Sequence, residues 1–200
     1  MGKTSILTKY IKNEFSLDYK VTLGIDFLNK EISKNNMKIN LQIWDTAGSE
    51  KYKSLLQSYY RNTEICVLTF DLTNINSFKN VEKWYKDFIN ISNIPEKNDF
   101  PFVLFGNKSD LIDDIKVKEK EVKKFCVGHN NMPYFFVSAK DGKNIEQSFE
   151  KIGDIAYNII INKNKEDLPE RKYLSIQKKK KSYFYLFMLN KFLKKNIFLS

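Results

Sequence analysis

Strand-like and helix-like segments alternate along most of this chain of 200 residues, and that order limits the possible folds more than any other feature. Several short apolar runs suit strands that are buried on both faces, and the segments between them place apolar residues at intervals of three and four. Such alternation is typical of a mostly parallel sheet with helices on both faces. The last three of the predicted strands are expected in the interior of the sheet. The sequence therefore predicts an α/β fold, with strands at 26–33, 38–44, 65–70, 102–105 and 134–137 and helices at 3–12, 76–91, 118–126 and 144–161.

The chain becomes highly charged after Asn162 and is broken at Pro169, so one domain should span 1–162 and a basic, partly hydrophobic tail should span 163–200. The net charge is +10, and the lysines concentrate late in the chain. That position favours an acidic membrane surface over a nucleic-acid groove as a partner. No apolar run approaches the roughly 18 residues that cross a bilayer. The two cysteines imply no disulfide framework, which fits a reducing cytosol.

The segment Gly2-Lys3-Thr4-Ser5 opens an amphipathic helix and matches the back half of a phosphate-binding loop. Backbone N–H groups at a helix N-terminus can face phosphates, Lys3 adds a positive charge, and the Thr4 hydroxyl can complete a magnesium shell. Further along, an apolar strand ends in Asp45, which places a carboxylate where α/β sheets bind ligands, and Gly48 leaves a backbone N–H open to a γ-phosphate. Taken alone, the first motif could be an ordinary helix start and the second a plain turn.

A polar tetrad, Asn107-Lys108-Ser109-Asp110, follows the buried run that begins at Phe102. Asp110 can accept two hydrogen bonds from the edge of guanine, whereas adenine lacks that pair of donors. Lys108 can lay its stem along the base, and Asn107 can tie the loop together. Ser138-Ala139-Lys140, just beyond the next apolar strand, can close the other side of the base. In this order, the motifs predict a site for GTP or GDP with Mg²⁺.

These motifs, together with Thr22-Leu-Gly24 and Trp44-Asp-Thr-Ala-Gly48, resemble the Rab branch of the Ras-like GTPases over about residues 2 to 162. Within that branch, the segments 19–31, 99–108 and 131–140 most resemble the late-endosomal and vacuolar Rab subfamily. The resemblance implies a P-loop domain that binds GTP and GDP with magnesium and hydrolyses GTP by in-line attack of water, with Lys3 and the metal stabilising the developing charge. It also implies an exchange factor, a GTPase-activating protein and effector proteins as partners.

Several residue roles are implied only by this resemblance. Thr22, in the first switch, would bind magnesium when GTP is present, and Asp45 would reach the metal through a water molecule. Phe15 falls where the family stacks an aromatic ring on guanine, although a core Phe at the end of a helix remains an alternative. Phe27 and Trp44, with Tyr59, resemble the hydrophobic triad that presents an effector surface, and burial in the core is equally open for them.

The sequence departs from the family at the phosphate loop and at the catalytic position. The glycine-rich front of the loop and the strand before it do not precede Gly2, and in this fold that strand lies centrally in the sheet. Its neighbours would then expose unpaired backbone groups, so the polypeptide taken literally is expected to fold poorly and bind nucleotide weakly. Ser49 follows Gly48 where the family carries the glutamine that orients the attacking water, which predicts slow hydrolysis.

The C-terminal residues lack the cysteines that Rab proteins prenylate. The tail itself could replace that anchor, because the apolar run 183–189 and the lysines Lys191, Lys194 and Lys195 resemble a basic interfacial helix. A tail without function is the other interpretation.

The sequence thus predicts a Rab-like switch in membrane traffic between endosomes and the vacuole, cytoplasmic and peripheral on those membranes. A catalytically inactive Rab-like interaction module is the alternative, favoured by the incomplete loop and by Ser49. A nucleic-acid-binding protein is supported only by the net charge, and no nucleic-acid partner is expected.

Overall fold

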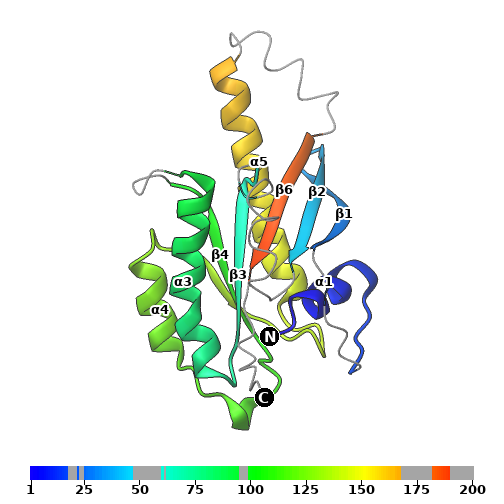
Figure 1. Ribbon diagram of the computed structural model, residues 1–200. Helices are drawn as coiled ribbons and strands as arrows, with labels where there is room; N and C mark the ends of the chain where they lie inside the picture. Colours follow the sequence, from blue (N-terminus) through cyan, green and yellow to red (C-terminus); the bar gives the residue numbers. More distant parts are fainter. Residues whose placement is uncertain are drawn as a thin grey trace, which may run out of the picture.

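The computed structural model describes residues 1–17, 22, 25–46, 60, 62–94, 99–167 and 182–189, which form one sheet flanked by helices (Figure 1). The strand order is β1-β2-β6-β3-β4-β5. Strands β1 and β2 are antiparallel, and every other neighbouring pair is parallel. The predicted α/β class with a mostly parallel sheet is therefore confirmed. The strands are β1 (Ile25–Lys34), β2 (Met37–Thr46), β3 (Ile65–Asp71), β4 (Phe102–Asn107), β5 (Tyr134–Phe136) and β6 (Ser182–Leu189).

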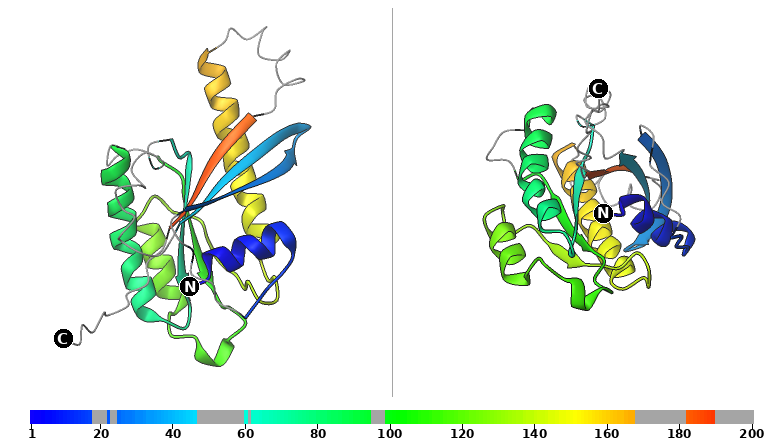
Figure 2. Two further views of the ribbon diagram at one scale, coloured as in Figure 1. Left: turned by 45° about the vertical axis from the view of Figure 1, so that its right-hand side comes forward. Right: turned by 60° about the horizontal axis from the view of Figure 1, so that its bottom comes forward.

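Helices cover both faces of the sheet, as Figure 2 shows. On one face lie α1 (Lys3–Lys12) and α5 (Ile145–Asp167), and on the other lie α3 (Ile75–Ser92) and α4 (Glu119–Val127). Two apolar cores follow from this layering, because alternate side chains of a strand point to opposite faces. In β2, Ile39, Leu41 and Ile43 face the core under α1 and α5, whereas Trp44 packs against the core under α3 and α4.

The first helix has the boundaries that the sequence predicts, and its limits have local causes. Ile6, Leu7 and Tyr10 recur at helical spacing and are buried against the sheet. Gly2 caps the helix with φ +85°, a left-handed conformation that glycine adopts without strain. Asn13 ends it with φ +56°, again left-handed, and its backbone N–H donates to the carbonyl of Lys9.

Strand β6 was not predicted, and it occupies the centre of the sheet. One of the two interpretations of the tail made residues 183–189 part of a basic interfacial helix, and that interpretation is wrong, because Ser182–Leu189 is a strand parallel to both β2 and β3. Figure 1 shows β6 between these two strands. The sequence also predicted a gap in the centre of the sheet, with exposed backbone groups on the strands beside it. That prediction is wrong for the described residues, because β6 fills the central position.

The other sequence predictions differ from the structure mainly at element ends. Strand β5 lies at an edge of the sheet rather than in its interior, and its residues are only half-buried. Helix α5 continues to Asp167, beyond the predicted domain end at 162, and the division into domain and tail stays a prediction. Among the helices of the described residues, none is both long enough and apolar enough to cross a membrane.

Candidate nucleotide-binding site

Several of the predicted site residues lie at the carboxyl ends of the strands. Asp45 lies near the end of β2, Asn107 ends β4, and α1 begins beside them at Gly2. The carboxyl edge is where α/β sheets bind ligands, because the loops that leave parallel strands converge there. The structure therefore brings the phosphate motif and the base motif to one edge.

Three oxygen-bearing side chains form a compact cluster at the first turn of α1. The Thr4 hydroxyl donates to Asp45 Oδ2 at 2.5 Å and lies 2.9 Å from the Thr22 hydroxyl. Thr22 Oγ1 is also 3.5 Å from the same carboxylate oxygen. The other oxygen, Asp45 Oδ1, is buried and accepts no hydrogen bond in the described structure. Two hydroxyls beside a carboxylate with an unsatisfied buried oxygen fit a hard cation such as Mg²⁺.

Lys3 and Asp45 form an electrostatic pair at the base of this cluster. Lys3 is 8% exposed, and burial lowers the pKa of its ammonium group, whereas the Asp45 charge acts in the opposite direction. Burial likewise raises the pKa of Asp45, opposed by Lys3 and by the Thr4 hydrogen bond. Burial therefore disfavours the charged form of both side chains. A phosphate beside Lys3 and a cation beside Asp45 would stabilise these charged forms.

Gly2 joins the phosphate motif to the base motif. The Asn107 amide donates to the carbonyl of Met1 at 2.8 Å. A Cβ atom added at Gly2 would lie only 2.7 Å from the Asn107 amide nitrogen, so a larger residue would disturb this approach. The link to Met1 was not predicted from the sequence, because no local signal marks it.

The base motif is held by hydrogen bonds between two loops. Ser138 Oγ donates to Asp110 Oδ1 at 2.7 Å, and the backbone N–H of Ala139 donates to Asn107 Oδ1 at 3.1 Å. Lys108 has φ +68°, which turns the chain between Asn107 and Asp110. Asn107 therefore links the loop after β4 to the loop after β5, and Ser138 holds one oxygen of Asp110.

Asp71 belongs to this region and was missed by the sequence analysis. Its Oδ2 pairs with Lys108 Nζ at 2.7 Å, and its Oδ1 accepts from the Thr73 N–H at 2.9 Å and the Thr73 hydroxyl at 2.7 Å. Burial alone would raise the Asp71 pKa, but the hydrogen bonds from Lys108 and Thr73 outweigh it and hold the pKa below its ordinary value. The available signal was its place at the end of β3, equivalent to that of Asp45 near the end of β2.

We expect Asp71→Asn to lower the free energy of unfolding by about 1–3 kcal/mol at pH 7, because it replaces a carboxylate that holds a charged partner. The folded pKa lies below the unfolded one, so this stabilisation is complete above about pH 4 and is lost as the pH falls through the folded value. Urea unfolding at pH 7 and pH 3 measures the difference, which should shrink at the lower pH. Asp113→Asn, at an exposed position in η2 (Ile112–Asp114), is the matched control. A constant difference at both pH values would contradict the assignment.

The remaining predicted residues differ in burial, and some lie outside the described part of the chain. Ser5 is half-buried in α1, and Lys140 is exposed beside Ala139. Phe15 is 38% exposed, which argues against its alternative as a core residue. Gly48, Ser49 and Tyr59 lie outside the described residues.

Two members of the expected effector triad are neighbours across β1 and β2. Phe27 pairs with Trp44 in the antiparallel ladder, with ring centroids 4.6 Å apart. Phe27 is 39% exposed, whereas Trp44 is partly buried against the core under α3 and α4. The pair is thus neither wholly buried nor wholly free, and its outer member can contact another molecule.

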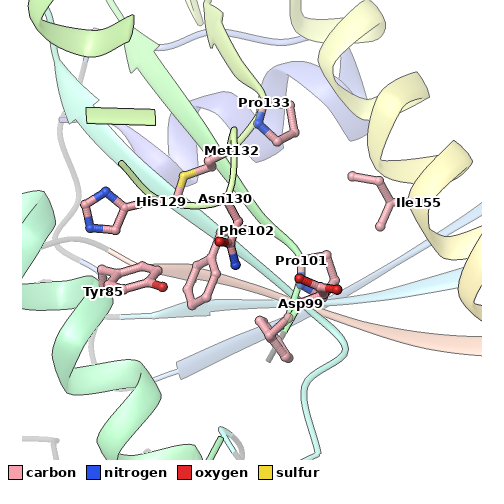
Figure 3. Close-up of a pocket in the computed structure, with 10 residues that line it drawn as sticks. Tyr85, Asp99, Pro101, Phe102, His129, Asn130, Met132, Pro133 and Ile155 are labelled. Atoms are coloured by element: carbon pink, nitrogen blue, oxygen red, sulfur yellow. The ribbon is translucent and has the colours of Figure 1, made fainter. Parts of the chain in front are cut away.

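A separate pocket of about 250 Å³ lies where β4 begins and α4 ends (Figure 3). Pro101 and Phe102 line it at the start of β4, and Met132 and Pro133 lie just before β5. This is the amino edge of the parallel strands, opposite the edge that carries Asp45 and Asn107. The pocket is therefore not part of the nucleotide site.

Comparison with known proteins identifies the family of this chain. Residues 1–158 match the model of the Ras family. The chain is 40% identical over 156 residues to "Ras-related protein Rab-7a" of Paramecium octaurelia, covering 78% of this chain and 76% of that protein. It is 42% identical over 154 residues to "Ras-related protein RABG3f" of Arabidopsis thaliana, covering 76% and 75%. It is 41% identical over 152 residues to "Ras-related protein Rab7" of Drosophila melanogaster, covering 76% and 73%.

These matches support the nucleotide-dependent switch over the inactive interaction module. The family match and the relatives confirm the resemblance to the late-endosomal and vacuolar Rab subfamily. The chain belongs to the Ras family as a Rab7-like small GTPase, a switch of endosomal and vacuolar membrane traffic that binds and hydrolyses GTP.

Proposed function

We propose that the two groups of side chains at the carboxyl edge are the two ends of one GTP site. Lys3, with the backbone N–H groups at the start of α1, binds the phosphates, and Asp110 with Lys108 and Ser138 binds guanine. The observation that carries this proposal is the contact of Thr4 with Asp45 and Thr22, three residues far apart in sequence. Gly2, Ser5, Ala139 and Lys140 complete the surroundings of the nucleotide, and Phe15 stacks on the base.

Thr4, Thr22 and Asp45 are the residues that would hold Mg²⁺, with Asp45 acting through a water molecule. The ion, when bound, supplies positive charge that neutralises the phosphates and the charge developing during hydrolysis. Thr4 and Asp45 lie on regular elements, α1 and β2, whereas Thr22 belongs to the connection between α1 and β1. Thr22 is therefore the member that can leave the cluster when the γ-phosphate is lost, and its departure reports the nucleotide state.

Replacing Thr22 with alanine is expected to weaken GTP binding by about 10-fold while changing GDP binding little, since only the GTP state uses its hydroxyl. Calorimetric titration of both nucleotides in Mg²⁺ measures this ratio. Thr8→Ala, a half-buried threonine on α1 away from the cluster, is the matched control and should change neither affinity. Equal losses for GTP and GDP in Thr22→Ala would overturn the role of Thr22 as the switch residue.

Hydrolysis should be slow without an activating partner. Lys3 would stabilise charge on the transferring phosphoryl group, and the motif that contains Gly48 would offer a backbone N–H to it. Serine at position 49 is too short to orient water in the way that the family's glutamine does, so a glutamine supplied by an activating protein would be needed for fast turnover.

Ser49→Gln is expected to raise the intrinsic rate of GTP hydrolysis on the order of 10²-fold, the lower end of what a positioned polar group contributes in a transition state. Single-turnover measurement of phosphate release tests this, and Ser49→Ala is the control that should leave the slow rate unchanged. A wild-type rate already equal to that of Ser49→Gln would refute the role given to position 49.

The exposed side of Phe27, with Trp44 and Tyr59, is the proposed contact for effectors. Aromatic residues of this kind supply large contact areas in protein interfaces. The protein would act as a peripheral protein on the cytoplasmic face of endosomal and vacuolar membranes. The late lysines Lys191, Lys194 and Lys195 would add electrostatic attraction to anionic lipids.

A further inference from the structure

Strand β6 connects two halves of the sheet that otherwise share no described ladder. One half is the antiparallel pair β1 and β2, and the other is β3, β4 and β5. Leu186 pairs with Ile43 of β2 and with Ile65 of β3, and Met188 pairs with Asp45 and with Val67. The backbone of a single C-terminal segment therefore joins both halves, as Figure 1 shows.

The two halves carry different ends of the nucleotide site. Asp45 lies on β2, and the hydroxyls of Thr4 and Thr22 contact it. Asp71 and Asn107 end β3 and β4, and Asp110 follows β4. The register places Met188 directly beside Asp45, so the carboxyl end of β6 lies between the cluster of Thr4, Thr22 and Asp45 and the loops that carry Asp110 and Ser138.

We propose that Ser182–Leu189 is an intramolecular donor strand that holds the phosphate end and the base end of the nucleotide site in register. Nucleotide binding by this chain then depends on residues about 180 positions away from Lys3. This inference goes beyond the GTPase assignment, because it gives a segment outside the matched residues 1–158 a positioning role in the site.

The composition of the segment suits this position. A parallel strand in the middle of a sheet has neighbours on both sides and helices over both faces. Its sequence is therefore a nearly continuous run of apolar residues. The residues from Tyr183 to Leu189 are all apolar or aromatic, without glycine, proline or charge. If the strand were absent, β2 and β3 would each present an open edge with unpaired N–H and C=O groups.

The position of β6 inside the sheet also excludes a membrane-bound helix formed by the same residues. A strand paired on both sides cannot at the same time be an amphipathic helix lying on a membrane. The segment is committed to the interior of the sheet, and membrane attraction is left to the lysines that flank it in sequence, 178–181 before it and Lys191 and Lys194 after it.

Amide hydrogen exchange on the unmodified full chain tests the placement first. The amides of residues 183–188 are expected to be as strongly protected as those of β3 and β4, because in the sheet they are paired on one or both sides. Exchange of these amides at the rate of an unstructured peptide would overturn the proposal. This readout needs no nucleotide, so it tests the placement of the strand independently of the GTP site.

A pair of proline substitutions tests the dependence of the site on the strand. Leu186→Pro removes a backbone donor at a position paired on both sides, whereas Ser182→Pro alters the first residue of the strand, where proline is tolerated. Leu186→Pro should lower GDP affinity at least about 10-fold and lower the protection of the Ile43 and Ile65 amides, and Ser182→Pro should do neither. Unfolding of Leu186→Pro beside a folded Ser182→Pro chain also supports the proposal. Unchanged affinity and protection in Leu186→Pro would overturn it.

Discussion

Replacing Asp110 with alanine is expected to lower the affinity for GDP by about 10²- to 10⁴-fold, the largest single effect in the site. In the proposed site the carboxylate would accept two hydrogen bonds from guanine, and each bond to a charged group contributes about 1.5–3 kcal/mol. Ser138 Oγ already donates to Oδ1 at 2.7 Å, so the carboxylate is oriented before the base arrives. Alanine removes both acceptors, and the polar edge of guanine is then buried without partners.

Competition titrations with GDP and ADP measure the specificity that Asp110 provides. ADP should bind weakly to both the unaltered protein and Asp110→Ala. The ratio of the GDP affinity to the ADP affinity should therefore fall toward one in Asp110→Ala. Asp113→Ala, three residues away and exposed, is the matched control and should retain the unaltered ratio. Retention of a strong preference for GDP in Asp110→Ala would mean that guanine is recognised elsewhere.

Replacing Lys3 with alanine is expected to weaken the binding of both GDP and GTP by at least about 10²-fold, because the proposed site would lose the buried ammonium group that binds the phosphates. Lys3 is 8% exposed at the first turn of α1 and acts on Asp45 electrostatically. Its loss also removes the charge that opposes the raised pKa of Asp45, so Asp45 takes up a proton more readily. Mg²⁺ should then be bound more weakly as well.

Lys12→Ala provides the control for Lys3→Ala. Lys12 lies in the last turn of the same helix and is exposed, so its loss changes the net charge equally without touching the site. Fluorescence titration with a labelled guanine nucleotide separates the two variants. Equal, small effects of both substitutions would show that Lys3 contributes only general charge.

The sequence predicts the regular elements well where the pattern is local. Helix α1 has its predicted limits, because the apolar spacing and the residues at both ends, Gly2 and Asn13, act within a few positions. Strand β6 was missed because an apolar run of this length does not distinguish a strand from a helix. Its place between β2 and β3 depends on contacts with residues more than 100 positions away, which no local pattern encodes.

The site residues were predicted by motif and order, and their contacts come from the fold. The motifs named Thr4, Asp45 and Asn107, but the Thr4 hydrogen bond to Asp45 and the Asn107 bond to Met1 depend on how α1 meets the sheet. Asp71 was missed because a single acidic residue at a strand end carries no motif of its own. Its pairing with Lys108 becomes visible only when β3 and β4 lie side by side.

Nucleotide binding by the full chain, measured with a fluorescent GDP analogue in Mg²⁺, tests the central claim most directly. Unlabelled GDP and GTP should displace the probe and ATP should not, and removal of Mg²⁺ by a chelator should weaken binding. Displacement by ATP as effective as that by GTP would contradict the assignment of the carboxyl edge of the sheet as a GTP site. Failure of the GDP analogue to bind would contradict it as well.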